Sequence, residues 1–153
     1  MNERYLIINA DDFGLCPAMN QAICELFRMG SITSSSVLAP APEAVAACKY
    51  AVDGHFPVGV HWTLYSEWER SCWPPAYSSG KPSSLTADGC LPADGGVAAK
   101  RAASGDVTKE LGAQYRLMAG EGCLPDHADS HGGTLYGING RFFFINAFRL
   151  CQK

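Results

Sequence analysis

The sequence predicts an α/β fold in which helices cover a parallel sheet. Short apolar runs rich in β-branched residues alternate along the chain with segments whose apolar residues recur at helical spacing. This alternation is typical of parallel strands joined by helical crossovers. The 153 residues are enough for a hydrophobic core, and a content of 47% hydrophobic and 18% charged residues is ordinary for a globular protein. We therefore expect residues 1–153 to form a single domain.

The first strand and the first helix have the clearest signals. Arg4–Ala10 form an apolar, β-branched run that is typical of a buried strand, and Asp11–Gly14 follow it as a turn. Pro17 suits the first turn of the next helix, and Gly30 suits the position just after its end. The residues expected to face the core from this helix are Met19, Ala22, Ile23, Leu26 and Phe27.

The same alternation continues through the rest of the chain, with one interruption. Further strands are expected over Ile32–Leu38, Pro57–Leu64 and Pro125–His131. Further helices are expected to open at Pro42, to run from Asp106 as the cap to Gly120, and to span Arg141–Lys153 with Phe144, Ala147, Phe148 and Cys151 facing inward. Residues 65–104 are rich in Pro, Gly, Ser and Ala and have no clear period. A connection of this length is usually functional or mobile, so we expect a long flexible loop there.

Charge and composition exclude several classes of partner. The net charge is −3, from 12 Lys and Arg against 15 Asp and Glu, and no basic stripe is present, so we expect no nucleic acid partner. No segment approaches the roughly 18 consecutive apolar residues of a membrane span, so we expect no membrane partner. The seven cysteines form no C-x-x-C pair. They predict reduced thiols in a cytoplasmic protein, with neither a disulfide framework nor a zinc ribbon.

Polar residues end three of the predicted strands. They are Asp11 with Asp12, His61, and the run Asp129-Ser130-His131. Each has a plain structural interpretation: a helix cap with a solvated neighbour, a hydrogen-bonding histidine, and a polar loop. Because the carboxyl ends of parallel strands meet at one edge of a sheet, however, all three signals are expected to converge.

A converging set of two histidines and a carboxylate is typical of a divalent-cation site with open positions for water and substrate. Adjacent aspartates can both face such a site only if the turn separates their side chains. One would then bind the metal while the other acts as a general base. The residues therefore predict metal-assisted hydrolysis, in which the metal polarises a carbonyl and the free aspartate accepts a proton from water.

Three segments carry a resemblance to a known family. Ile8–Gly14 reads I-N-A-D-D-F-G, Val58–Leu64 reads V-G-V-H-W-T-L, and Pro125–His131 reads P-D-H-A-D-S-H. In this order they resemble the motifs of the YdjC-like carbohydrate deacetylases, the family that includes chitooligosaccharide (diacetylchitobiose) deacetylase. Gly30–Ser34 is also similar to the turn that leads into that family's second strand. The resemblance covers nearly the whole chain.

The resemblance implies a fold, a reaction and a set of site residues. The fold would be an irregular (β/α) barrel of the polysaccharide-deacetylase type, and the reaction would remove N-acetyl groups from sugars such as chitooligosaccharides and release acetate. The implied metal ligands are Asp12, His61 and His131, the implied catalytic base is Asp11, and the implied partners that orient His131 are His127 and Asp129. The implied cofactor is a divalent ion, Mg²⁺ by the family's usual description, while the donor set would also suit Zn²⁺.

Two features depart from the family pattern. His131 is followed by Gly132–Gly137, where many members carry further histidines; the glycines would either let a sugar approach the backbone or only form a tight loop. A full (β/α) barrel takes about 250 residues, so truncation after about four β/α units is expected. The His-Pro motif that holds the family's general acid would then be missing. A four-stranded remnant would expose a sheet edge and apolar surface, which a homodimer would cover.

Two further hypotheses compete with a deacetylase. One is a non-catalytic remnant of such an enzyme, which binds metal or sugar without turnover. The other is a sugar-binding module that stacks sugar rings on Trp62, Trp68 and Trp73. The last two tryptophans lie in the long loop, where such stacking residues would be exposed. Sugar binding that survives a chelator would favour the module over the enzyme.

Overall fold

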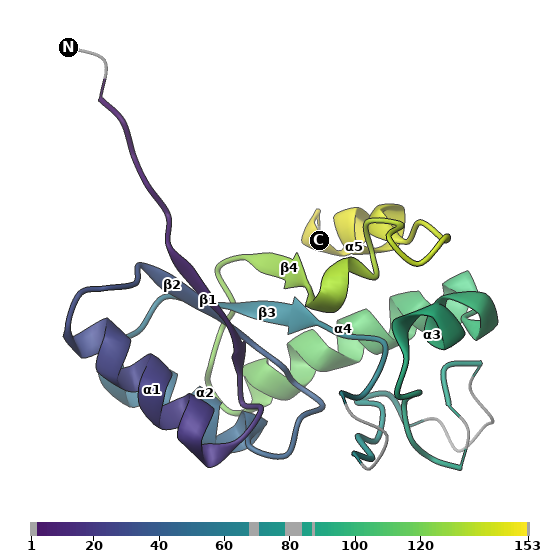
Figure 1. Ribbon diagram of the computed structural model, residues 1–153, viewed down its shortest axis with the longest axis horizontal. Coiled ribbons are helices and arrows are strands. Elements are labelled where there is room, and N and C mark those ends of the chain that lie inside the picture. The colour runs from purple at the N-terminus through teal and green to yellow at the C-terminus, as the bar shows by residue number, and fades with distance from the viewer. Residues whose placement is uncertain (1–2, 68–70, 79–83, 87, 153) are drawn as a thin grey trace.

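Four parallel strands form the centre of the molecule and alternate along the chain with helices (Figure 1). The computed structural model describes residues 3–67, 71–78, 84–86 and 88–152. The strands are β1 (Asn9–Phe13), β2 (Ser34–Val37), β3 (Val58–Trp62) and β4 (Ala128–Ser130). The helices are α1 (Pro17–Arg28), α2 (Ala44–Gly54), α3 (Gly95–Arg101), α4 (Ser104–Gly120), the 3₁₀ turn η1 (His131–Gly133) and α5 (Phe144–Cys151). The predicted α/β class with a parallel sheet is confirmed.

The strands lie in the sheet in the order in which they occur in the chain, β1-β2-β3-β4. All three pairings are parallel, and the register of the last one places His61 beside Asp129. The carboxyl ends of the strands therefore meet at one edge of the sheet. A (β/α) barrel is also built by adding parallel strands in sequence. Closure of such a barrel stays a prediction.

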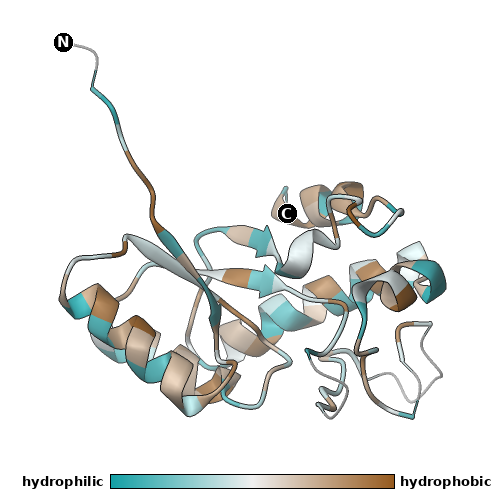
Figure 2. Cartoon of the chain, viewed as in Figure 1, coloured by the Kyte–Doolittle hydropathy of each residue, from teal (hydrophilic) through white to brown (hydrophobic). Residues whose placement is uncertain are grey.

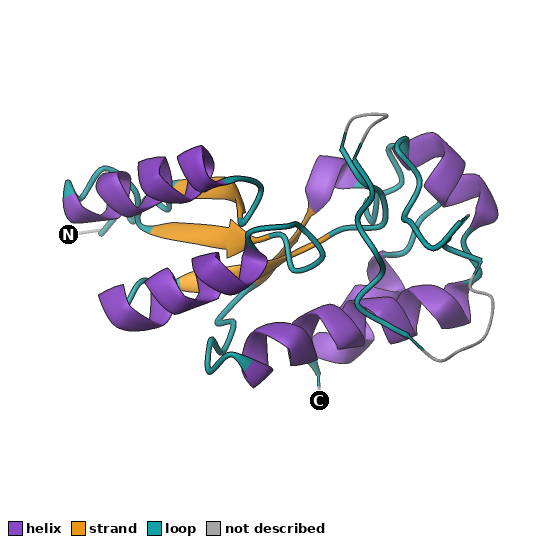
Figure 3. Cartoon of the chain, turned by 90° about the horizontal axis from the view of Figure 1, so that it is seen from below, coloured by secondary structure: helices purple, strands orange, loops and turns teal. Residues whose placement is uncertain are grey.

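The two faces of the sheet differ because side chains alternate along each strand. Val37, Val60 and Trp62 belong to the hydrophobic core, and the Trp62 indole donates a hydrogen bond to the Leu111 carbonyl of α4 at 3.0 Å. The helices α1, α2 and α4 lie beneath the sheet in Figure 1, and Figure 3 shows from below how helices run alongside the strands. The opposite face is polar, and it carries His61. This alternation directs apolar residues toward the helices and leaves the other face for chemistry.

β1 begins later than predicted. It spans Asn9–Phe13, and residues 5–7 before it are 76% to 86% exposed. Its neighbour β2 begins only at Ser34. The first backbone hydrogen bonds between the two segments are therefore those that Ile8 accepts from the N–H groups of Thr33 and Ser34. The preceding segment runs away from the sheet with its apolar residues uncovered (Figure 1, Figure 2). The expectation of a buried strand over residues 4–10 is therefore wrong for most of its length.

The bounds of the longer helices follow the sequence pattern. α1 begins at Pro17, and Gly30, with a φ of +69°, follows its end as predicted. α4 ends at Gly120, but Asp106 lies in its first turn instead of at its cap. The Asp106 carboxylate instead accepts hydrogen bonds from the Ser84 N–H and hydroxyl at 2.9 and 2.8 Å. None of the described helices is both long and apolar enough to span a membrane.

The C-terminal helix α5 buries less of itself than predicted. Ala147 faces inward with 4% exposure, but Phe144 and Phe148 are 43% and 52% exposed and Cys151 is also exposed. The aromatic ring that enters the core is that of Phe143, directly before the helix. The predicted inward position is confirmed for Ala147 and wrong for Phe144, Phe148 and Cys151, because the phase of the helix depends on where α4 packs against it.

Residues 65–104 contain more regular structure than expected. α3 lies within them and is capped by Asp94, whose carboxylate accepts a hydrogen bond from the Val97 N–H at 2.9 Å. Leu85 and Leu91 are buried in the main core. The long loop expected over residues 65–104 therefore contains the helix α3, while its flexibility stays a prediction.

A disulfide joins Cys72 to Cys90 within the same region. The Leu91 N–H beside it donates a hydrogen bond to the Trp73 carbonyl at 2.9 Å. The disulfide and this hydrogen bond together join the two sides of the loop. The expectation that every cysteine is a reduced thiol is therefore wrong for this pair, while the other five cysteines are free. Sequence spacing could not predict the pair, because only the path of the loop brings its ends together.

Candidate metal centre

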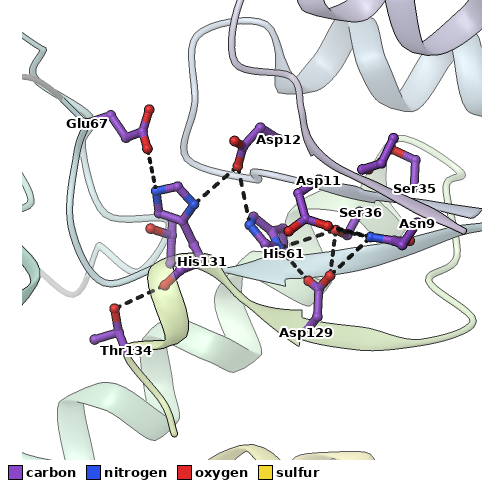
Figure 4. A network of polar contacts seen from close by, with 12 residues as sticks. Asn9, Asp11, Asp12, Ser35, Ser36, His61, Glu67, Asp129, His131 and Thr134 are labelled. Atoms are coloured by element: carbon purple, nitrogen blue, oxygen red, sulfur yellow. Dashed lines mark hydrogen bonds and ion pairs between the residues drawn. The ribbon is translucent and has the colours of Figure 1, made fainter. Parts of the chain in front are cut away.

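The polar residues that end the strands meet at the carboxyl edge of the sheet (Figure 4). Asp11 and Asp12 lie in β1, and His61 lies in β3. Asp129 lies in β4 beside His61, and His131 follows directly in η1. The structure thus brings together five of the six residues that the sequence singled out.

Both aspartates of β1 face this site because the strand is irregular between them. A regular strand would send adjacent side chains to opposite faces of the sheet. Here the register with β2 shifts between residues 10 and 13, and Asp12 has a φ of +65°. This left-handed conformation costs a non-glycine residue about 1 kcal/mol or more and is held by the surrounding structure. The two resulting groups of clustered ligand atoms are Asp12 with His61 and His131, and Asp11 with His61 and Asp129.

Asp12, His61 and His131 surround a common point. The Oδ1 atom of Asp12 lies 3.3 Å from His61 Nε2 and 3.2 Å from His131 Nδ1. Both histidines are 3% exposed, and their rings lie 5.1 Å apart at an angle of 73°. Within the described chain, Asp12 Oδ1 is buried without a partner in hydrogen-bond geometry. A buried carboxylate oxygen flanked by two imidazole nitrogens fits a divalent cation, which these three residues would hold.

The charges of the site shift two pKa values in opposite directions. Burial alone would lower the pKa of His61, but contacts with Asp12 and Asp129 outweigh burial and raise that pKa to about 9. The contacts with His131 and then with His61 hold the pKa of Asp12 well below its usual range. At neutral pH a protonated His61 therefore faces an ionised Asp12, and a cation at this point would take the place of the proton.

Asp129 holds His61, which corrects the expectation that it orients His131. Its Oδ1 lies 2.5 Å from His61 Nδ1. Its Oδ2 accepts hydrogen bonds from the Ser36 hydroxyl at 2.7 Å and from the Asn9 amide at 3.3 Å. The strand register explains the difference, because it pairs Asp129 with His61.

His127 lies outside this cluster and also differs from expectation. Its Nδ1 is 2.5 Å from the Asp126 carboxylate, and its ring lies so close to Gly59 that a Cβ there would come within 2.5 Å of it. Among the described residues, no hydrogen bond or ion pair links His127 to His131. His127 precedes Asp129 by two residues, which places it about 7 Å farther from the carboxyl edge.

Sequence reasoning missed several residues that contact the site. The Oε1 atom of Glu67 lies 3.4 Å from His131 Nε2, and the Tyr65 ring stacks on His131 with centroids 4.8 Å apart. Both follow the end of β3, so their place at the carboxyl edge was a usable signal. On β2, Ser36 lies on the polar face of the sheet, which alternation within the serine-rich strand could have revealed.

The glycines after His131 form a tight loop. Gly132 has a φ of +53°, and a Cβ at this position would collide with the Tyr65 hydroxyl. Glycine is therefore required both by the backbone and by the close approach of Tyr65. Of the two interpretations left open by the sequence, the structure supports the tight loop.

The two tryptophans that the structure describes do not form an exposed platform for sugar rings. Trp62 and Trp73 are 4% and 2% exposed, and Trp68 lies outside the described residues. Trp73 packs in a small apolar cluster with Leu15 and Leu38, and its ring centroid lies 6.4 Å from that of His131. The prediction of exposed stacking residues is wrong for Trp73.

Comparison with known proteins identifies the relatives of this chain. A carbohydrate deacetylase from Geobacillus stearothermophilus is 37% identical over 131 residues, which are 84% of this chain and 49% of that protein. A chitooligosaccharide deacetylase from Proteus mirabilis (strain HI4320) is 37% identical over 134 residues, which are 82% of this chain and 48% of that protein. The chain thus spans about half the length of the curated relatives it matches.

A solved structure shares the fold. The crystal structure of a protein from Enterococcus faecalis V583, suggested to act in cellobiose-phosphate cleavage, superposes with a TM-score of 0.81 at 30% identity. The match covers 95% of this chain and 54% of that protein. The sequence model of the family described as YdjC-like protein matches residues 5–145. This chain therefore belongs to the YdjC-like family.

Proposed function

We propose that this chain is a metal-dependent hydrolase that removes N-acetyl groups from sugars such as chitooligosaccharides and releases acetate. The observation that carries the proposal is the buried cluster of Asp12, His61 and His131, with Asp11 beside it. The names of the relatives, carbohydrate deacetylase and chitooligosaccharide deacetylase, support the reaction and the class of substrate.

Each residue of the site has a chemical role in this proposal. A cation held by Asp12, His61 and His131 would polarise the acetyl carbonyl and increase the acidity of water. Asp11 accepts the proton of the attacking water, since its carboxylate adjoins the same site and is exposed to solvent. The Asn9 amide donates to Asp11 Oδ1 at 2.7 Å and so orients the base. Asp129 keeps the Nδ1 proton of His61 on the side away from Asp12.

The proposed cation is Mg²⁺, with Zn²⁺ as the alternative. The resemblance to the family favours Mg²⁺, whereas two imidazoles and one carboxylate form the donor set that Zn²⁺ prefers. Metal-free protein supplied with each ion in turn decides between them. The native ion is the one that restores hydrolysis at a physiological concentration.

The proposal is tested by acetate release from N-acetylglucosamine oligomers. The purified chain should release acetate, a chelator should abolish the release, and added metal should restore it. In Asp11→Asn the metal should still bind, because Asp12, His61 and His131 are intact, while turnover should fall at least about 100-fold. Full activity in Asp11→Asn would show that another group accepts the proton.

A second candidate is a chain that binds metal or sugar without turnover. The observation in its favour is that the chain spans about half the length of its curated relatives. The distinguishing result is metal binding with no acetate release by the 153-residue chain, and release restored by a longer chain that includes a His-Pro motif. Acetate release by the 153-residue chain itself excludes this candidate.

The partners and compartment belong to the same proposal. The proposed ligand is an N-acetylated sugar, and the proposed assembly is a homodimer that covers exposed apolar residues such as Ile7 and Phe148. Light scattering of the purified chain tests the dimer. Five free cysteines support the cytoplasm, while the Cys72–Cys90 pair is of the kind that persists in oxidising compartments. Thiol counting on protein isolated under acid quench tests the compartment.

A further inference from the structure

His131 lies between two carboxylates, and only one of them belongs to the metal cluster. Its Nδ1 faces Asp12 Oδ1 at 3.2 Å, and its Nε2 faces Glu67 Oε1 at 3.4 Å. In Figure 4 Glu67 points at the ring from the side away from Asp12. The Nε2 atom is buried and has no partner in hydrogen-bond geometry within the described chain. A buried ring nitrogen needs a partner, and Glu67 is within reach of it.

The other histidine of the cluster shows what such a partner does. One nitrogen of His61 faces Asp12, and the opposite nitrogen lies 2.5 Å from the Asp129 carboxylate. A carboxylate at the far nitrogen fixes which nitrogen carries the proton and how the ring is turned, and it makes the near nitrogen more basic. Glu67 lies at the far nitrogen of His131 in the same way that Asp129 lies at the far nitrogen of His61.

Glu67 is placed as a partner of the ring and not as a fourth ligand. The clustered ligand atoms belong to Asp12, His61 and His131, and Glu67 is not among them. Its carboxylate approaches the ring nitrogen opposite the one that faces Asp12. A ligand would have to reach the space between the imidazoles, which the ring of His131 separates from Glu67.

The backbone directly before Glu67 is anchored. The Ser66 N–H donates to the Pro92 carbonyl at 2.7 Å, and the Ser66 hydroxyl donates to the Leu91 carbonyl at 3.1 Å. On the other side of Ser66, the Tyr65 ring stacks on His131 with centroids 4.8 Å apart. These contacts hold the segment after β3 against His131, so the fold itself places the Glu67 carboxylate near the His131 ring.

We propose that Glu67 is a positioning residue that accepts the Nε2 proton of His131 and directs Nδ1 toward the metal site. This inference rests on the metal site of the proposed function, and it adds a residue to which no motif assigns a role. Removing the carboxylate should weaken metal binding roughly 10- to 100-fold, the usual effect of losing such a partner. Because Glu67 is partly exposed, the metal-free fold should be little affected.

The test compares three variants of the whole chain by calorimetric titration with Zn²⁺ and by the visible absorption spectrum of bound Co²⁺. Glu67→Gln keeps a hydrogen-bond acceptor and loses the charge, so its affinity should fall between those of the parent and Glu67→Ala. Both substitutions should shift the Co²⁺ spectrum, since the ligand field of His131 changes. Glu121→Gln, an exposed substitution at the end of α4, is the matched control and should bind both ions as the parent does.

Each outcome bears on the proposal, and the proposed function is judged separately. Affinity in Glu67→Ala within about twofold of the parent, with an unchanged Co²⁺ spectrum, would overturn the role of Glu67 alone. Absence of metal binding by the parent chain would overturn both the metal site and this inference. If the parent binds metal but releases no acetate, the deacetylase proposal fails while the ordered loss of affinity from parent to Gln to Ala still supports Glu67.

Discussion

Binding of a divalent metal at about pH 7.5 is expected to release about one proton from His61. The pKa of this imidazole is about 9, because two carboxylates contact its two nitrogens. The ring is therefore almost fully protonated at that pH, whereas Nε2 must lose its proton to bind a metal. Each unit of pH below 9 should weaken the apparent metal affinity about tenfold.

Calorimetric titration with Zn²⁺ between about pH 6 and pH 8.5, in buffers of different ionisation enthalpy, measures both the affinity and the protons released. Asp129→Asn is the informative variant, since loss of the charge at Nδ1 should lower the pKa of His61 and flatten the pH dependence near neutrality. An affinity of the parent chain that stays constant between about pH 6 and pH 8 would refute the reasoning.

The same ionisation affects the stability of the metal-free protein. This stability should fall as the pH rises, whereas the metal affinity should increase. A pKa raised from 6.5 to about 9 contributes stability that is fully present below pH 6.5 and is lost as the pH rises to about 9. The contribution is at most about 3 kcal/mol. Urea unfolding of the metal-free chain should show the free energy of unfolding falling over this range, and His61→Gln should reduce the fall. A parent chain whose stability rises over the range contradicts the assigned protonation.

Three further predictions concern the structure around the site. Gly132→Ala should lower the free energy of unfolding by about 1–3 kcal/mol, because its φ is positive and the new Cβ meets Tyr65; an unchanged melting temperature would show that the loop yields. Asn20→Ala should cost a similar amount, about 1–3 kcal/mol in urea unfolding, since this buried side chain accepts the Gly14 N–H at 2.7 Å and donates to the Glu43 carbonyl at 3.2 Å; an unchanged free energy of unfolding would contradict this role. Cys72→Ser removes the disulfide and should cost about 3 kcal/mol under oxidising conditions; equal stability of parent and variant without reductant would mean that the bond does not form in solution.

Local patterns in the sequence were enough to predict the layers of this protein. Pro17 and Gly30 delimit α1 because each has a backbone preference that acts within one turn of the helix. The apolar runs before His61 and the polar residues after each strand predicted parallel strands with a shared edge. Asp11, Asp12, His61 and His131 could therefore be placed together, since parallel strands leave their carboxyl ends side by side.

The contacts between side chains could not be read from the same patterns. Asp129 lies two residues from His131 in the sequence and yet holds His61, because strand register determines which side chains face each other. The disulfide, the burial of Trp73 and the outward phase of α5 likewise depend on how distant segments pack. None of these has a periodic signal along the chain.

The sequence by itself determined that this is a parallel α/β protein of the YdjC-like family with an Asp, His, His cluster at one sheet edge. Only the tertiary structure decided how that cluster is arranged. The left-handed turn at Asp12 aims two adjacent carboxylates at one site, and the segment after β3 brings Glu67 to His131. The physical reason is range: propensity and alternation act between neighbours in the chain, whereas the orientation of a ligand is set by residues that meet only after folding.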